Sequence, residues 1–309
     1  MRITQNTTAS NSIYYLQQQQ QSLNQLTEQV ATQQKINQPS DDPVNTSLLL
    51  GIGDQLKAND QYSTNITQAT TSLQMTNTAL QGMSDTMQQA KTLIDSISSG
   101  SSDPTVLNSV VSQLQALKQS LVDYGNTQLG NQYLFSGAKS STQPFSSPTT
   151  FNGTSNSYNG DGTAVSVEIG QSTKQQVNIT GNQILTGSNP PASSLPYGTT
   201  NILQTFDNLI TAVGANNVAG IQAGAQSLDS GADQITNAQS DVASRLIRLN
   251  NATTMNTNTQ NTLQTIAGNV QYVDMNQLGV ELTQQQTAYQ ASLSATAKIT
   301  QMSLLDYLK

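Results

Sequence analysis

The sequence contains no cysteine and no histidine among its 309 residues. The absence of cysteine excludes disulfides and thiolate metal sites. The absence of histidine excludes Ser-His and Cys-His nucleophile pairs and the His-Glu-x-x-His zinc motif, because each of these needs an imidazole. We therefore expect a protein that is not an enzyme and has no catalytic residue, no cofactor and no metal.

Charged residues are scarce. They make up 9% of the chain, against about 25% in an ordinary globular protein. Gln, Asn, Ser and Thr take their place, and these neutral groups repel other copies of the chain less than like charges would. This composition favours ordered self-assembly. The net charge is −7 and no basic cluster is present, so we expect no nucleic acid as a partner.

Long apolar runs are also missing. No stretch approaches the roughly 18 apolar residues that a membrane span needs, so we expect no membrane partner. The first residues, Met1 to Gln5, lead into polar residues and not into an apolar core. This pattern predicts that there is no cleavable signal peptide, and taken alone it predicts a cytoplasmic protein.

A narrow apolar stripe runs along each end of the chain, surrounded by Gln. A helix with so narrow a stripe is not stable alone, because helical stability comes mostly from packing an apolar face. We therefore expect the first and last segments to be helices that pair with each other and with neighbouring subunits. The predicted subunit-interface residues are Ile13, Leu16, Leu23, Leu26, Val30, Leu278, Leu282, Tyr289, Leu293, Leu304 and Leu305.

The run Pro39-Ser40-Asp41-Asp42-Pro43 interrupts the first segment. Pro39 is expected to end the helix before it. Asp42 is a good N-cap for the next helix, with Pro43 at the first helical position. We interpret Pro39, Asp42 and Pro43 as a capped hinge. A metal site on Asp41 and Asp42 is disfavoured, because adjacent side chains in a cap do not converge.

Two longer segments carry apolar residues at seven-residue steps, the pattern of a coiled-coil seam. In the first they are Ile66, Leu73, Leu80, Met87 and Ile94, followed three residues later by Ala69, Thr76, Met83, Ala90 and Ile97. In the second they are Ile221, Leu228, Ile235, Val242, Leu249, Asn256, Leu263 and Val270. Asn256 is the only polar member of the second series, a device that can fix register. A shorter helix between the two is predicted to begin at Asp103 and Pro104.

The pattern changes in the middle of the chain, where Gly and Pro recur. Alternation at Val165, Val167 and Ile169 predicts a strand, and the run at residues 159–162 before it predicts a hairpin turn. That run lacks the further carboxylates of a calcium loop. The Pro-rich stretch at residues 190–196 is typical of a linker.

These patterns predict a mainly α protein, a long coiled-coil-like helical bundle formed by the N- and C-terminal regions with a small inserted β-domain. We expect three domains. Residues 1–42 with 271–309 form the terminal helices, residues 43–137 with 200–270 form the helical bundle, and residues 138–199 form the β-rich insert.

Arg245 and Arg248 lie off the apolar stripe of the second series, and Asp241 stands one helical turn before Arg245. Ion pairs at this spacing are common on helix surfaces and contribute little to stability. A surface ion pair is therefore the favoured interpretation, and a contact between subunits is the alternative.

Several local motifs resemble those of the flagellar hook-associated protein 3 family, the flagellin-like proteins of the hook–filament junction. The most specific runs from Gly125-Asn126-Thr127 to Tyr133-Leu134-Phe135-Ser136-Gly137, followed by Thr142-Gln143-Pro144-Phe145. The other matching runs are residues 2–5, 35–43, 244–246, 290–293 and 303–308. Asp241-Val242-Ala243 departs from the family's usual Ile-Gly run.

The resemblance implies a structural subunit of the bacterial flagellum, exported unfolded by the type III export apparatus without a cleavable signal peptide. This overrides the cytoplasmic prediction and implies an extracellular location at the hook–filament junction. The implied partners are copies of the chain itself in a ring, the first hook-associated protein, flagellin and a cytoplasmic export chaperone. The terminal helices would form the inner tube, the bundle the next shell, and the insert the outer surface.

Two alternatives share parts of this pattern. Flagellin, the filament subunit, has the same plan, but its hinge usually lacks the prolines found here at Pro39 and Pro43, and it forms filaments alone. A secreted adhesin with a helical stalk is the second alternative, but it would not need two unpaired terminal stripes.

Overall fold

The structure is a computed structural model that describes residues 5–98, 103–146, 158–187 and 196–307. The chain divides into two compact units: Met1–Ala58 with Thr259–Lys309, called the terminal unit, and Asn59–Asn258, called the bundle unit. In the described part of the chain, no helix is long and apolar enough to cross a membrane. The prediction of a mainly α fold with a small β-rich insert is confirmed.

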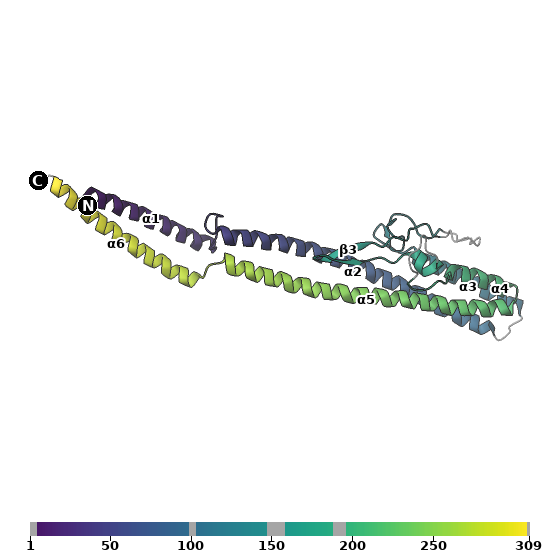
Figure 1. The fold of residues 1–309 in the computed structure, drawn as a ribbon. Helices are drawn as coiled ribbons and strands as arrows, with labels where there is room; N and C mark the ends of the chain where they lie inside the picture. Colours follow the sequence, from purple (N-terminus) through teal and green to yellow (C-terminus); the bar gives the residue numbers. More distant parts are fainter. Residues whose placement is uncertain (1–4, 99–102, 147–157, 188–195, 308–309) are drawn as a thin grey trace. The chain divides into compact units, whose positions relative to one another are not determined.

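The bundle unit is built from α2 (Pro43–Ser98), α3 (Pro104–Gly125), α4 (Ile202–Gly214) and α5 (Val218–Gln271), of which α2 and α5 continue beyond its limits (Figure 1). The predicted seven-residue series form its core. The members from Ile66 to Ile94 and from Ile221 to Leu249 are at most 3% exposed. These stripes hold the helices together, because burying a large apolar side chain contributes about 1.5–3 kcal/mol.

Side-chain caps and one ion pair fix the shorter helices of this unit. The Asp103 carboxylate accepts the Thr105 backbone N–H at 2.8 Å and begins α3, as predicted. Lys118 of α3 forms an ion pair with Asp207 of α4 at 2.6 Å, and the Lys118 side chain is only 7% exposed. The run Ser99-Gly100-Ser101-Ser102 predicts a stop between α2 and α3, but these residues lie outside the described part of the chain. Residues 190–195 of the predicted linker also lie outside it.

The described residues between α3 and α4 form two small antiparallel sheets, of which the second lies within the predicted insert at residues 138–199. In the first, β1 (Gln128–Leu129) pairs with β2 (Gln132–Tyr133). In the second, β3 (Ser166–Gly170) pairs with β4 (Thr173–Gln176), and a one-turn π-helix, η1 (Asn182–Thr186), follows. The predicted strand at residues 165–169 corresponds to β3.

The prediction of a hairpin turn at residues 159–162 is wrong. The turn that joins β3 to β4 is at Gln171 and Ser172, where Ser172 has a φ of 58°. Residues 159–162 instead form a loop around Asp161, whose backbone N–H donates to the Ser136 carbonyl and whose carboxylate accepts the Ala138 N–H. The Asn-Gly pair does mark a bend in the chain, but this loop forms hydrogen bonds with residues 136–138 and does not connect two paired strands.

The motif between Gly125 and Phe145 closes the base of the insert. The Asn126 side chain donates to the Phe145 carbonyl and accepts the Phe145 N–H, both at 2.9 Å. The Phe145 ring is fully buried against two glycines. A Cβ added at Gly125 would lie 2.7 Å from this ring, and one at Gly181 would lie 2.8 Å from it. The motif therefore describes packing between the end of α3 and the insert.

The prediction that Arg245 forms a surface ion pair is wrong. Arg245 is 7% exposed, and its guanidinium donates to Asp241 at 2.6 Å and to the Asn178 carbonyl at 2.8 Å. The Tyr197 hydroxyl donates to the same Asp241 carboxylate at 2.6 Å. Asn178 and Tyr197 both lie within the predicted insert at residues 138–199, so this network joins the insert to α5.

Gln234, two helical turns before Asp241 on α5, also binds segments outside the helix. Its side chain is fully buried, and its amide nitrogen donates to the Ile184 carbonyl at 2.6 Å. Its amide oxygen accepts the Thr200 N–H at 3.0 Å. Burial is tolerated because these bonds replace the hydrogen bonds that the amide would make with water.

Candidate assembly interface

The terminal unit contains α1 (Gln5–Thr32) and α6 (Met275–Tyr307), which pack side by side with both chain ends at the same end of the pair (Figure 1). Their mutual packing is what the two narrow stripes predict. Leu278 is buried at 2% exposure. The other predicted residues that the pair half-buries are Leu16, Leu23, Leu26, Val30, Leu282 and Tyr289.

The pair leaves part of each predicted stripe uncovered. Ile13 remains 49% exposed and Leu293 remains 44% exposed. Tyr14 and Tyr15 beside Ile13 are still more exposed. Their rings contact each other edge to face, with 5.8 Å between the ring centroids. The predicted residues Leu304 and Leu305 are helical, but their side chains lie outside the described residues. One α1–α6 pair therefore does not bury its own apolar surface.

Sequence reasoning missed further exposed apolar side chains of the terminal unit. They lie at the start of α2, near the end of α5 or just after it, and on α6, outside the stripes at seven-residue spacing. These residues are Val44, Leu48, Leu50, Ile266, Tyr272, Met275 and Val280. Their signal was present as a high apolar content close to the hinge, but without a regular period it did not distinguish an outer face from a core.

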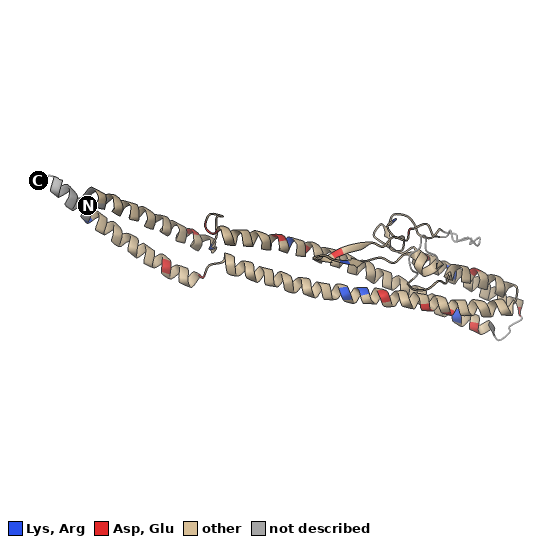
Figure 2. Ribbon diagram, in the orientation of Figure 1, with Lys and Arg blue, Asp and Glu red and all other residues tan. Residues whose placement is uncertain are grey.

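Charged residues are scarce on α1 and α6. Figure 2 shows α1 and α6 mostly in tan. Glu28 is the one charged residue of α1, and α6 carries Glu281, Lys298 and Asp306. Apolar and neutral polar groups can pack against like surfaces without the desolvation cost of buried charges, so the surface is suited to contacts between subunits.

The breaks at residues 33–42 and 272–274 are held together by backbone hydrogen bonds. Lys35 N–H donates to the Gln271 carbonyl at 2.7 Å, and Val273 N–H donates to the Gln33 carbonyl at 3.3 Å. The prediction that Pro39 ends the first helix is wrong, because α1 ends at Thr32. Gln33 then adopts a left-handed backbone with φ 58°, which turns the chain toward α5. The hinge role of Pro39, Asp42 and Pro43 stays a prediction.

The two aspartates of the interruption have separate structural roles. Asp41 accepts the backbone N–H groups of Asn37 and Gln38 at 3.0 and 2.9 Å. Asp42 accepts the backbone N–H of Asn45 at 3.0 Å and its side-chain amide at 2.7 Å, and so caps α2 as predicted. Each carboxylate is directed at its own backbone donors, which is the geometry of caps.

The Asp42 cap should be lost in acid. The backbone N–H of Asn45, and then its side-chain amide, lower the pKa of Asp42 below its ordinary value of 3.8. A lowered folded-state pKa means that the cap stabilises the helix above the unfolded value and that this contribution is lost as the pH falls through the folded value. In an NMR titration between about pH 2 and 6, spanning the ordinary carboxyl range, the Asn45 amide should therefore titrate with a midpoint below 3.8.

The matched variant for this titration is Asp42→Asn, since Asn caps about as well as Asp but does not ionise in this range. Its Asn45 amide should show no such transition. A midpoint at or above 3.8 in the parent chain would contradict the capping role.

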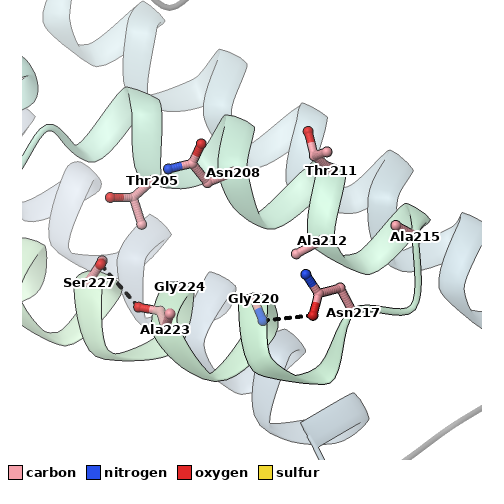
Figure 3. Close-up of a pocket in the computed structure, with 10 residues that line it drawn as sticks. All are labelled: Thr205, Asn208, Thr211, Ala212, Ala215, Asn217, Gly220, Ala223, Gly224 and Ser227. Atoms are coloured by element: carbon pink, nitrogen blue, oxygen red, sulfur yellow. Dashed lines mark hydrogen bonds between the residues drawn. The ribbon is translucent and has the colours of Figure 1, made fainter.

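A pocket lies at the corner between α4 and α5 (Figure 3). It has a volume of about 380 Å³, and its lining residues carry no carboxylate, amine, guanidinium or thiol. Two hydrogen bonds within it, from Gly220 N–H to the Asn217 side chain and from the Ser227 hydroxyl to the Ala223 carbonyl, are local helix contacts. Across the described ranges, no group of acidic residues could hold a metal ion.

Two family models match the chain. The bacterial flagellin N-terminal helical region matches residues 3–140, and the bacterial flagellin C-terminal helical region matches residues 225–308. Together they cover more than half of the chain. The chain belongs to the flagellin-like family. The two regions include α1 and α6, the helices that pair in the terminal unit, and the resemblance based on local motifs is confirmed.

Among flagellin-like proteins, the relatives are hook-associated. The chain is 27% identical over 190 residues to flagellar hook-associated protein 3 of Escherichia coli strain K12, which covers 60% of this chain and 58% of that protein, less than two thirds of its length. It is 24% identical over 293 residues to flagellar hook-associated protein 3 of Salmonella typhimurium strain LT2, covering 90% of both.

A solved structure shares the fold. The flagellar junction protein FlgL from Legionella pneumophila aligns with a TM-score of 0.57 at 17% identity, covering 74% of this chain and all of that chain. The flagellin-like family and the hook-associated relatives make this chain a structural component of the bacterial flagellum.

Proposed function

We propose that the chain is an adaptor subunit of the hook–filament junction and has no catalytic role. The observation that carries the proposal is the terminal unit, in which α1 and α6 pair but leave Ile13 and Leu293 about half exposed. A surface that is apolar, nearly uncharged and only half covered requires further partners. The names of the relatives, hook-associated protein and junction protein, support a position at the junction.

In this proposal, the neighbours are copies of the chain itself in a ring, the first hook-associated protein below and flagellin above. A cytoplasmic chaperone covers the C-terminal helix before export. The terminal helices form the inner tube, residues 43–137 with 200–270 form the next shell, and residues 138–199 face outward. The extracellular location follows from this assembly.

Deletion of the gene tests the proposal. Cells without the chain should carry hooks that lack filaments and should release flagellin into the medium, and a plasmid copy should restore filaments. Purified protein should not grow long filaments alone, whereas a filament subunit would. Filaments on the deletion strain would refute the adaptor role, and unaided filament growth by the purified chain would identify it as the filament subunit.

A further inference from the structure

Within the bundle unit, the last layer of the seam between α2 and α5 is a pair of asparagines, Asn59 and Asn256. Asn256 lies seven residues beyond Leu249 in the α5 series, and Asn59 lies seven residues before Ile66 in the α2 series. The Asn59 side-chain amide donates to the backbone carbonyl of Asn256 at 3.2 Å, and the Asn256 side-chain amide donates to the backbone carbonyl of Asn59 at 2.9 Å. Both residues belong to the bundle unit. The pair continues the register of the seam without continuing its apolar contact.

The α5 segment around this pair is a poor helix by composition. Residues 250–258, here called the polar segment, read Asn-Asn-Ala-Thr-Thr-Met-Asn-Thr-Asn. Asn and Thr are both unfavourable in helix interiors relative to Ala, so the helix here depends on packing. Within this segment Ala252 packs against the core, but the larger apolar side chain of Met255 is 69% exposed. Weak propensity and weak packing thus coincide.

The threonines of the polar segment add local competition for the backbone. The hydroxyls of Thr253, Thr254 and Thr257 each donate to the carbonyl four residues earlier, at 2.9, 3.2 and 3.0 Å. Such bonds compete with the helical N–H donors for the same carbonyls and commonly bend helices. By contrast, the α5 seam residues from Ile221 to Leu249 are almost fully buried.

We infer that the polar segment is a conformational joint, at which α5 opens locally while the rest of the bundle unit stays folded. The Asn59–Asn256 pair closes the joint in one register, because a polar residue at a seam position specifies alignment at a cost in stability. A slide by seven residues would place Asn59 against Leu249 or Leu263, where no second amide faces it. This property belongs to the single chain and does not depend on its assembly partners.

Native-state hydrogen exchange on the full chain, as a dilute monomer, tests the joint. Amides of residues 253–258 should exchange at least about 100-fold faster than amides of residues 225–249, because local openings cost less free energy than global unfolding. Low urea should accelerate exchange in residues 225–249 but hardly change it in the polar segment, since a local opening exposes little surface. Equal rates and equal urea sensitivity in the two segments would overturn the inference.

Surface substitutions provide the matched test. Asn251→Ala with Thr254→Ala replaces two exposed residues of the polar segment with a stronger helix former and should slow its exchange by about 5- to 10-fold. The control, Thr236→Ala with Ser240→Ala, replaces two exposed residues of α5 whose hydroxyls bond backward in the same way. It should leave exchange in residues 253–258 unchanged. If the control slows that exchange as much as the test pair does, the opening is not local and the joint is refuted.

Discussion

Replacing Arg245 with alanine is expected to lower the free energy of unfolding of the bundle unit by about 3 kcal/mol, the lower end of the range for removing one partner of a buried ion pair. The lower end applies because Asp241 keeps 31% of its side-chain surface in water. The substitution also leaves the Asn178 carbonyl without its guanidinium donor. For a unit of this size, the midpoint of thermal unfolding should fall by roughly 6–12 °C. Urea unfolding followed by circular dichroism measures the change.

Two variants control for charge and for side-chain length. Arg248→Ala removes an exposed arginine three residues further along the same helix and should change stability by less than about 0.5 kcal/mol. Arg245→Lys retains the charge but lacks the planar fork that reaches Asp241 and Asn178 together, so it should fall between the two. If Arg245→Ala and Arg248→Ala unfold at the same urea concentration, the buried network does not hold the insert on α5.

Replacing Ile13 and Leu293 with aspartate is expected to abolish assembly and leave the fold of the bundle unit unchanged. Each side chain is about half exposed in the single chain. Burying such a side chain contributes about 1.5–3 kcal/mol, and burying an unpaired carboxylate costs more than this contribution. In cells without the parent gene, the double variant should be secreted and folded but should give no filaments and leave flagellin in the medium.

Secretion of the double variant must be measured apart from assembly, because an export chaperone would contact the same C-terminal helix. Val106→Asp is the matched control, since Val106 is 42% exposed on α3 of the bundle unit. It should be secreted and should support filaments. Swimming by the double variant at the parental rate would show that this surface is not the assembly interface.

The elements that the sequence predicted well are those that repeat. Stripes such as Ile66 to Ile94 recur at seven-residue steps for several turns, and only a buried helix face explains that regularity. The caps at Asp42 and Asp103 were predictable for a related reason, since a cap depends on side chains within three residues of it. The pairing of α1 with α6 followed from a simpler argument: two incomplete stripes need a partner.

The errors concern contacts between residues distant in sequence. Asp241 and Arg245 would have the same i,i+4 spacing in an exposed pair and in a buried one. The pair is buried because Asn178 and Tyr197 pack against it, and these residues are distant in sequence. The sequence predicts a helix stop at Pro39, but α1 ends at Thr32 because the chain turns at Gln33 toward the backbone of α5. The partner of Asn256 was also missed. Asn59 lies one heptad before the α2 series, but the sequence does not show which heptad of α2 lies opposite Asn256 on α5.

The hydrogen bonds between residues 33–35 and 271–273 hold the end of α1 close to the start of α6. The lengths of the two helices can therefore be compared from this point. From there α1 extends over 28 residues and α6 over 33, or roughly 42 and 50 Å at 1.5 Å per residue. Removing seven residues from α1 would turn its stripe by only about 20°, at 100° per residue. Removing five would turn it by about 140° and face Gln toward α6. The lengths of α1 and α6 can therefore change by whole heptads and keep their apolar stripes facing each other, because the backbone hydrogen bonds at residues 33–35 and 271–273 fix one end of the pair.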